Sequence, residues 1–142
     1  MKTLNQLKMQ IDAKSTNESF TRAAVGAFIA QLDPTIEEIS DIKTAVSEAV
    51  TNCIVHAYKE EKGNIYITVK IFDNNKVLIK IRDKGCGIPD IEKAKEPLFT
   101  TGGSERAGLG FAVMESFTDK MRVISKVGKG TCISLYKEIK SK

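Results

Sequence analysis

The chain has 142 residues, of which 42% are hydrophobic and 28% charged, and we expect a single globular domain over residues 1–142. This length excludes a two-lobed protein kinase, and no apolar run approaches the about 20 residues that cross a membrane. The net charge is +4, and its excess lies in residues 72–142, where 14 basic residues stand against 9 acidic ones. We interpret this excess as a solvated face or as a site for a small polyanion. No basic stripe with interleaved aromatic residues is present, so we expect no direct DNA binding.

The cysteines and the N-terminal segment indicate a cytoplasmic protein. Cys53, Cys86 and Cys132 lie far apart and outside any CxxC motif, so neither a disulfide framework nor a zinc site is expected. We interpret them as reduced thiols in or near the core. Residues 1–7 carry no apolar core of a signal peptide, so we expect neither export nor membrane association.

The chain begins with a strand pattern and a helix pattern. Apolar and polar residues alternate over residues 7–11, which predicts a strand. Apolar residues at helical spacing predict a helix over residues 18–32, with Ser15 or Asn17 as its N-cap. The apolar face that this spacing predicts consists of Phe20, Ala23, Ala24, Ala27, Phe28 and Ile29.

A second helix and a hairpin follow. Asp33 and Pro34 end the first helix and begin the next over residues 35–57, with Asp33 as the cap and Pro34 at the first helical position. Alternating segments at residues 65–71 and 77–81 flank a polar turn and predict a β-hairpin.

The second half of the chain completes a sandwich. We expect a short helix at 90–95, a polar loop over 97–108 and a helix over 110–117, followed by strands at 121–125 and 131–135. This order predicts a two-layer α/β sandwich, in which helices cover one face of a mixed, mostly antiparallel sheet.

One polar stripe runs along the otherwise apolar second helix. Glu48, Asn52 and His56 are spaced by four residues and therefore share one helix face. The stripe either forms a hydrogen-bonded seam between helices or faces a ligand. In the second case the amide oxygen of Asn52 suits Mg²⁺ and Glu48 suits a general base, whereas a lone His56 is more often structural.

Asp83 ends a predicted strand and is followed by glycines at alternate positions. Gly85 and Gly87 permit positive φ angles and a close approach of the backbone to a ligand. An aspartate at a strand end accepts hydrogen bonds from an amino group such as the exocyclic amine of adenine. The alternative is an irregular turn without a ligand.

The third candidate segment runs from Thr100 to Gly110. Glycines ahead of a helix present free N–H groups at the positive end of the helix dipole, which suits phosphate. Arg106 and Lys95 can supply positive charge. The segment is either a mobile surface loop or a functional lid, and it does not match a Walker A motif. Gly85 and Gly87 do not match a Rossmann fingerprint, because they open no helix directly.

Together these motifs resemble those of the gyrase, heat-shock chaperone, histidine-kinase and MutL ATPase superfamily. Residues 48–52 resemble its N-box, residues 83–87 its first glycine box and residues 108–110 its second. The short chain, residues 97–101 and residues 17–22 resemble one branch, the anti-sigma factors of endospore formation that are also serine-protein kinases.

The resemblance implies the Bergerat ATP-binding fold, bound ATP or ADP with Mg²⁺, and an ATP lid at about residues 95–108 that draws on the positive charge of the second half. It implies that Asn52 holds Mg²⁺ and that Glu48 is the general base. It also implies that Asp83 reads the adenine amine, with Thr131 assisting. The other nucleotide contacts fall on His56, Gly85, Gly87, Thr100, Thr101, Arg106, Gly108, Leu109 and Gly110.

For partners, the resemblance implies a homodimer in which the positions of Glu18 and Arg22 contact two proteins. These are the sigma factor and the anti-anti-sigma protein that competes for the same surface and supplies the serine substrate. The residues alone indicate only an exposed i, i+4 ion pair worth a few tenths of a kcal/mol. Two alternatives are a general stress-response anti-sigma kinase and a non-catalytic module that sequesters a sigma factor.

Overall fold

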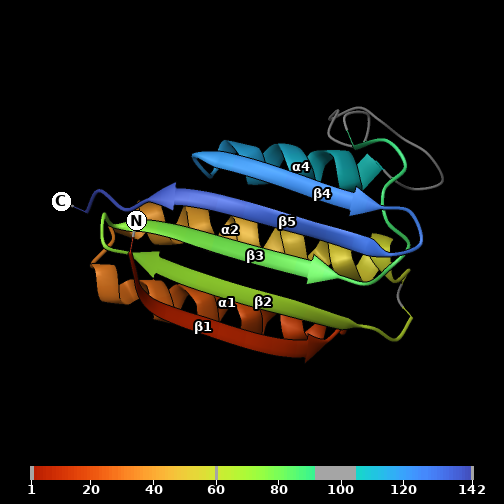
Figure 1. Cartoon of the computed structure of the whole chain (residues 1–142), viewed down its shortest axis with the longest axis horizontal. Helices are drawn as coiled ribbons and strands as arrows, with labels where there is room; N and C mark the ends of the chain where they lie inside the picture. The colour runs from red at the N-terminus through yellow and green to blue at the C-terminus, as the bar shows by residue number, and fades with distance from the viewer. Residues whose placement is uncertain (1, 60, 92–104, 142) are drawn as a thin grey trace.

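The computed structural model describes residues 2–59, 61–91 and 105–141, and for residues 105–109 it describes the backbone alone. Five strands form one sheet in the order β1-β2-β3-β5-β4, and all four strand pairings are antiparallel (Figure 1). The strands are β1 (Thr3–Asp12), β2 (Asn64–Phe72), β3 (Lys76–Asp83), β4 (Lys120–Lys126) and β5 (Gly130–Glu138).

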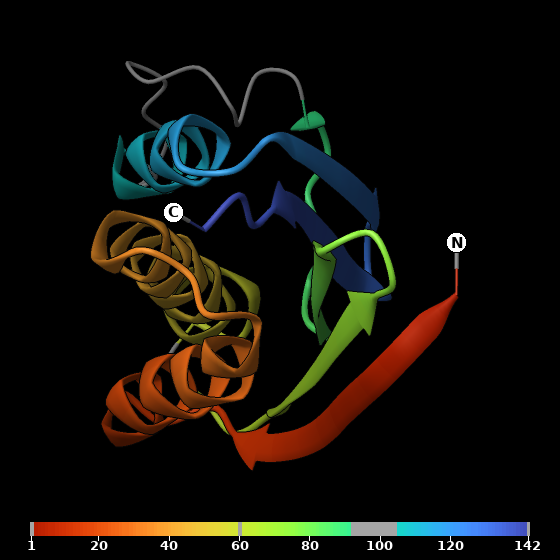
Figure 2. The ribbon, with the colours of Figure 1, turned by 90° about the vertical axis from the view of Figure 1, so that its left-hand side faces the viewer.

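The described helices all lie on one face of this sheet (Figure 2), which confirms the predicted two-layer sandwich. They are α1 (Thr16–Ile29), the 3₁₀ turn η1 (Ala30–Leu32), α2 (Ile36–Asn52), the π-helix η2 (Cys53–Ala57) and α4 (Glu105–Ser116). α2 lies between α1 and α4 and packs against both. The core between the two layers includes Val46, Val50, Ile67, Ile79 and Leu135.

The predicted elements are confirmed with shifts at their ends. The hairpin of β2 and β3 pairs Ile67 with Ile81 across the predicted turn. α4 begins at Glu105 instead of residue 110. Of the short helix expected at residues 90–95, residues 92–95 lie outside the described residues.

The buried face of α1 agrees with the predicted one at Ile29 and differs from it toward the start of the helix. Phe20 is 56% exposed and Ala23 is exposed, whereas Thr21, Val25 and Ile29 are fully buried. The branched side chains of Val25 and Ile29 remove more apolar area from water than alanines do. The hydroxyl of Thr21 is satisfied because it donates to a backbone carbonyl one turn earlier, at 2.8 Å. Ala23 and Ala27 of the predicted face are therefore exposed to solvent.

α2 begins at a capping box on Thr35, so the prediction of Asp33 as its cap was wrong. The Thr35 hydroxyl accepts the N–H of Glu38 at 3.1 Å, and the Glu38 carboxylate accepts the N–H of Thr35 at 2.9 Å. Asp33 instead has a φ of 54° and ends η1, so Pro34 precedes the helix. Thr35 forms the cap because Glu38, three residues later, returns the bond, whereas the residue three positions after Asp33 is Ile36.

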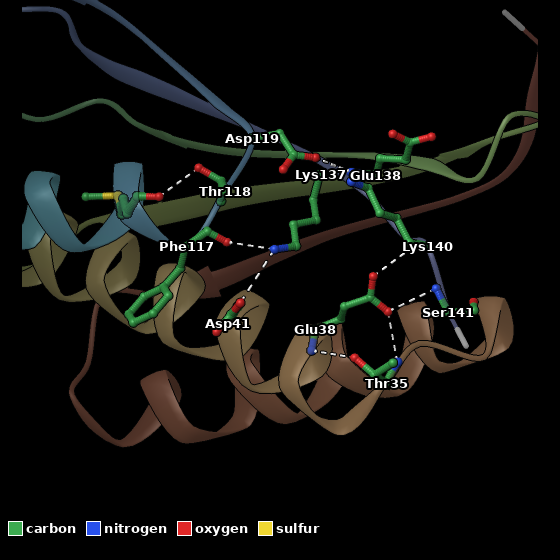
Figure 3. Close-up of polar contacts among 11 residues, drawn as sticks. Thr35, Glu38, Asp41, Phe117, Thr118, Asp119, Lys137, Glu138, Lys140 and Ser141 are labelled. Carbon is green, nitrogen blue, oxygen red and sulfur yellow. Dashed lines mark hydrogen bonds and ion pairs between the residues drawn. The ribbon is translucent and has the colours of Figure 1, made fainter.

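The Glu38 carboxylate also holds the C-terminal segment (Figure 3). It accepts the N–H groups of Lys140 at 2.8 Å and Ser141 at 3.3 Å, and the Ser141 hydroxyl donates to the carbonyl of Leu32 at 3.1 Å. Burial by itself raises the pKa of Glu38, but the N–H groups of Thr35, Lys140 and Ser141 outweigh it and lower the pKa. One carboxylate thus joins the start of α2 to the chain beyond β5.

Glu38→Ala should lower the free energy of unfolding by about 1–2 kcal/mol at neutral pH, because a helix cap and two further hydrogen bonds are lost. The folded pKa lies below the reference value of 4.5, so this stabilisation is complete above that value and is lost as the pH falls through the folded pKa. Urea unfolding at about pH 7 and about pH 3 measures the difference. Glu37→Ala, which removes the neighbouring exposed carboxylate, is the control and should cost below about 0.5 kcal/mol. An equal loss from Glu38→Ala at both pH values would contradict the role of the ionised carboxylate.

Lys137 reaches from β5 into the helical layer (Figure 3). Its ammonium lies 3.6 Å from the carboxylate of Asp41 on α2 and donates to the carbonyl of Phe117, just beyond α4, at 3.3 Å. A cation at the end of α4 also matches the negative end of the helix dipole. The contact therefore connects β5 with both helices that pack over it.

The cysteines are free thiols, as expected, but they occupy three environments. Cys53 is buried, Cys132 is partly exposed, and Cys86 is exposed on the loop after β3. The prediction that all three lie in or near the core was therefore wrong for Cys86. In the described part of the chain, no helix is long and apolar enough to span a bilayer.

Candidate functional site

α2 presents Glu48 and Asn52 toward α4. Asn52 is 8% exposed and Glu48 is half-buried. Gly110 of α4 lies against both, since a Cβ atom placed on it would stand 3.2 Å from Oε2 of Glu48 and 3.3 Å from Oδ1 of Asn52. A larger residue there would fill the space in front of the two side chains. The structure thus brings together the predicted polar stripe and the second glycine motif.

The amide nitrogen of Asn52 is buried and has no hydrogen-bond partner among the described residues. Such a group costs free energy unless a ligand satisfies it, so its presence indicates a binding site. The amide oxygen of Asn52 and the carboxylate of Glu48 are ligands of the kind that Mg²⁺ takes in combination with phosphate and water oxygens. Within the described residues, no group of three or more His, Cys, Asp or Glu is placed to hold a metal ion alone.

The helix widens directly after Asn52 into η2, where a continuous α-helix was predicted. The N–H of Tyr58 bonds to the carbonyl of Cys53, five residues earlier, at 3.0 Å. The four-residue spacing of the polar stripe therefore does not continue to His56, which is half-buried. Turns of this kind inside α-helices are frequent at functional sites.

The loop after β3 packs between η2 and the β4–β5 turn. The N–H of Cys86 donates to the carbonyl of Ala57 at 3.0 Å, and Gly85 lies so close to this carbonyl that a Cβ atom would overlap it. Gly87 has a φ of +78°, and a Cβ atom there would overlap the carbonyl of Lys126. Both glycines of the predicted motif are therefore required for this packing.

Asp83, the last residue of β3, is 5% exposed and its carboxylate is held by three donors. Oδ1 accepts the N–H groups of Gly85 at 2.9 Å and Thr131 at 3.2 Å, and Oδ2 accepts the thiol of Cys53 at 3.5 Å. Burial raises the pKa of Asp83, and the three donors partly offset this. Burial and the neighbouring Asp83 raise the pKa of Cys53 well above its ordinary value, so the thiol stays a neutral donor. These bonds fix the orientation of the carboxylate.

Two residues that the motifs did not single out complete this end of the site. Cys53 bonds Asp83, and Ser125 shares a hydrogen bond of 2.7 Å with the hydroxyl of Thr131. Ser125 also accepts the N–H of Ile88 at 2.8 Å, which fixes the end of the glycine loop. A signal for Ser125 exists in the sequence, because it occupies an inward position of β4 where the alternation predicts an apolar residue.

The second glycine motif lies within α4 instead of ahead of it. Because α4 begins at Glu105, Gly108 belongs to its first turn, and the N–H of Gly110 lies beyond the four that lack a partner inside the helix. The backbone of residues 105–108, which the resemblance assigned to the lid, is therefore helical in this structure. Outside the described part are the side chains of four predicted contacts, Thr100, Thr101, Arg106 and Leu109.

Glu18 and Arg22 lie on α1, which α2 separates from α4 (Figure 2). The guanidinium of Arg22 stands 3.6 Å from the carboxylate of Glu18, with side chains that are 43% and 23% exposed respectively. The predicted ion pair is present. The exposed part of α1 also carries the ring of Phe20, an aromatic side chain of the kind enriched at protein interfaces.

Comparison with known proteins identifies the family. The family model described as histidine kinase-like ATPase domain matches residues 11–137. The chain therefore belongs to the histidine kinase-like ATPase domain family, and its fold is that of a nucleotide-binding domain.

Two relatives that resemble this chain over nearly its whole length are named anti-sigma F factor. The protein from Caldanaerobacter subterraneus subsp. tengcongensis is 57% identical over 136 residues, which cover 95% of this chain and 94% of that protein. The protein from Thermoanaerobacter sp. strain X514 is 55% identical over 143 residues, 99% of each. The solved RsbU and RsbW domains of a Mycobacterium tuberculosis protein superpose with a TM-score of 0.69 at 21% identity, covering 95% of this chain and 32% of that one. This last similarity shows the shared fold.

Proposed function

We propose that this protein is an anti-sigma factor that binds and inhibits a sporulation sigma factor of the sigma F type. We further propose that it is an ATP-dependent serine kinase that phosphorylates and inactivates its anti-anti-sigma antagonist. The observation that carries the proposal is the 57% identity, over 95% of this chain, to a protein named anti-sigma F factor. The protein would work as a homodimer of single-domain chains in the cytoplasm, where sigma factors act.

Glu48 and Asn52 divide the proposed chemistry. Asn52 would hold Mg²⁺, which when bound neutralises charge on the phosphate oxygens. Glu48 accepts the proton of the serine hydroxyl as that oxygen bonds to the γ-phosphorus and the bond from this phosphorus to the ADP oxygen breaks. The close approach of Gly110 to both side chains, which leaves no room for a Cβ atom without strain, and the unpartnered amide nitrogen of Asn52 support this assignment. Further contacts with the phosphates are proposed for Thr100, Thr101, Arg106, Gly108, Leu109 and Gly110.

Asp83 and Thr131 are proposed to bind the adenine base. Oδ1 of Asp83 already accepts two backbone N–H groups, whereas Oδ2 accepts only the weak thiol donor of Cys53. Oδ2 therefore retains capacity for the exocyclic amine of adenine. Gly85 and Gly87 shape this end of the pocket, and half-buried His56 lies beside it on η2.

Two experiments separate the parts of this proposal. Incubation with γ-labelled ATP, Mg²⁺ and a purified anti-anti-sigma protein should label a serine of that protein, and absence of label despite bound ATP would contradict the kinase. A pull-down with sigma F in ATP and in ADP tests the anti-sigma activity. If a general stress-response sigma factor is retained in place of sigma F, the proposed kinase activity stands but the proposed sigma-factor partner is wrong.

Arg22→Glu should weaken sigma-factor binding about tenfold or more, because it removes the ion pair with Glu18 and reverses a charge on the proposed α1 surface. Binding of ATP should be unchanged, since no described contact joins this pair to Asn52. Lys14→Glu, an equal change of charge just before α1, is the control and should bind like the original protein. Titration calorimetry with each ligand measures both affinities. A parallel loss of ATP and sigma-factor binding would indicate misfolding and contradict a local role.

A further inference from the structure

The face of the sheet opposite the helices is covered by no described element (Figures 1 and 2). Three adjacent rows of outward-pointing residues cross it through Leu78, Lys80 and Arg82 of β3, with one position from each of the five strands. None of these positions is acidic; the acidic residues of this face, Asp12 and Glu138, lie beyond the rows. The basic residues in the rows, which we term the open-face cluster, are Lys8, Lys70, Lys80, Arg82, Lys120 and Arg122.

The charge of this cluster is not neutralised within the described part of the chain, where its members form no ion pair. Two of them instead lie over tyrosine rings. Arg82 stands 4.9 Å from the ring centre of Tyr66, as does the neighbouring Lys84, and Lys120 stands 5.6 Å from the ring centre of Tyr136. The face therefore presents a positive potential that a negative partner would complement.

One end of the cluster is hollowed. A cavity of about 170 Å³ lies between the end of β3 and the β4–β5 turn, and its lining includes Arg82, Lys126, Lys129 and Ile124 together with Asp83 and Thr131, the residues proposed above to bind adenine. Ile124 is 57% exposed and the adjoining Val127 is 63% exposed. Basic groups beside exposed apolar side chains can receive a carboxylate together with an apolar neighbour, as at the anchored centre of a protein interface.

The observations favour one kind of occupant. A second copy would bring the same surface to itself, so basic residues would face basic residues. Single-stranded nucleic acid stacks its bases on free aromatic faces, but Tyr66 and Tyr136 are already covered by cations of this chain. A bilayer surface requires several apolar side chains that insert, whereas the rows carry two aliphatic side chains, of which Ile124 is 57% exposed and Leu78 only 8%.

We propose that the open-face cluster is a second protein-binding surface, which takes an acidic segment of a partner protein across its basic rows. α1, with Glu18 and Arg22, lies on the opposite side of the sheet (Figure 2). A partner on the open face therefore leaves the proposed sigma-factor surface accessible. The inference depends on the charges of the sheet and not on the proposed kinase activity.

A fluorescein-labelled peptide of glutamates with a central leucine is the probe, measured by anisotropy at an ionic strength of about 0.15 M, where long-range attraction between exposed charges is screened. The triple variant Lys80→Glu, Arg82→Glu, Arg122→Glu should bind the peptide at least about tenfold more weakly than the original protein. Thermal unfolding confirms that the variant folds, and sedimentation compares its oligomeric state with that of the original protein.

The matched control reverses three exposed basic residues outside the strands, Lys14, Lys59 and Lys62, to glutamate and so has the same net charge. It should bind the peptide like the original protein. Equal binding by both triple variants, or no binding at this ionic strength, would overturn the proposal. It would also be overturned if an oligothymidylate of equal charge or phosphatidylserine vesicles bound more tightly through the same residues, or if the open-face variant alone changed its oligomeric state.

Discussion

Replacing Glu48 by glutamine should lower serine phosphorylation by about 10²–10⁴-fold while nucleotide binding is retained. Glutamine has nearly the shape of glutamate, but its amide does not accept the hydroxyl proton during transfer. Glu48 forms no ion pair with any described residue, so its carboxylate is not committed to a structural contact. Its Oε2 instead lies against Gly110 of α4, 3.2 Å from where a Cβ atom would stand. The substitution therefore removes a base and little else.

The measurement is the rate of label transfer in a single turnover with saturating ATP. Glu37→Gln, which changes an exposed carboxylate on the same helix, is the control and should transfer at the original rate. An unchanged rate in Glu48→Gln would place the base elsewhere. A loss of ATP binding in the same variant would assign Glu48 a role in the ligand site and not in proton transfer.

Asn52→Ala should weaken the binding of ATP with Mg²⁺ about 10- to 100-fold, because the variant lacks the amide oxygen proposed to hold the metal. Without Mg²⁺ the affinities of the two proteins should differ much less. The ligand-free variant should also lose less than about 1 kcal/mol of unfolding free energy, because the buried amide nitrogen that it lacks has no partner among the described residues. If Asn52 served only packing, Asn52→Ala would instead lower the free energy of unfolding strongly and would change the affinity for ATP equally with and without Mg²⁺.

Titration calorimetry with and without Mg²⁺, together with urea unfolding, measures these effects. Asn74→Ala, in the exposed turn between β2 and β3, is the control for removing an asparagine amide and should leave nucleotide affinity unchanged. Two outcomes would contradict the proposal for Asn52: an equal loss of affinity with and without the metal, or a loss of several kcal/mol in stability without ligand.

The features that depend on local periodicity could be predicted from the sequence. Strict alternation fixed the pairing of β2 with β3, because a shift by one residue would turn every apolar side chain to solvent. The four-residue spacing of Glu48 and Asn52 predicted that both lie on one face of α2, and both lie against Gly110 of α4. In each case the spacing of the residues along the chain determines which face of the strand or helix they occupy.

The features that depend on tertiary packing could not be predicted in this way. On the predicted apolar face of α1, Ile29 is buried but Phe20 is exposed, and packing against the rest of the fold buries Val25, which the periodicity did not include. The sequence carries no local signal for the π-helix after Asn52. The carbonyl of its last residue, Ala57, accepts the N–H of Cys86 in the loop after β3, a contact between segments distant in the sequence. The start of α2 is a different case, because Thr35 and Glu38 form a capping-box pattern that the sequence itself carries.

Much of the positive charge of residues 72–142 lies on one face of the sheet, because side chains in a strand point alternately to its two faces. The resemblance links this charge to the lid. In the structure, however, six of the 14 basic residues of this half occupy outward positions of β3 and β4, on the face opposite the helices. They are Lys76, Lys80, Arg82, Lys120, Arg122 and Lys126.

The backbone hydrogen bonds of Cys86 affect local unfolding around the loop after β3. Its N–H is held by Ala57 of the helical layer, and its carbonyl accepts the N–H of Gly128 in the β4–β5 turn at 2.8 Å. Cys86 thus bonds the loop after β3 to both layers, through its N–H and its carbonyl. Local unfolding of η2 breaks the first of these hydrogen bonds, and local unfolding of the β4–β5 turn breaks the second. The end of α2, the glycine loop and the end of the sheet therefore form one cooperative unit of local unfolding. A ligand that orders any one of them reduces the fluctuations of all three.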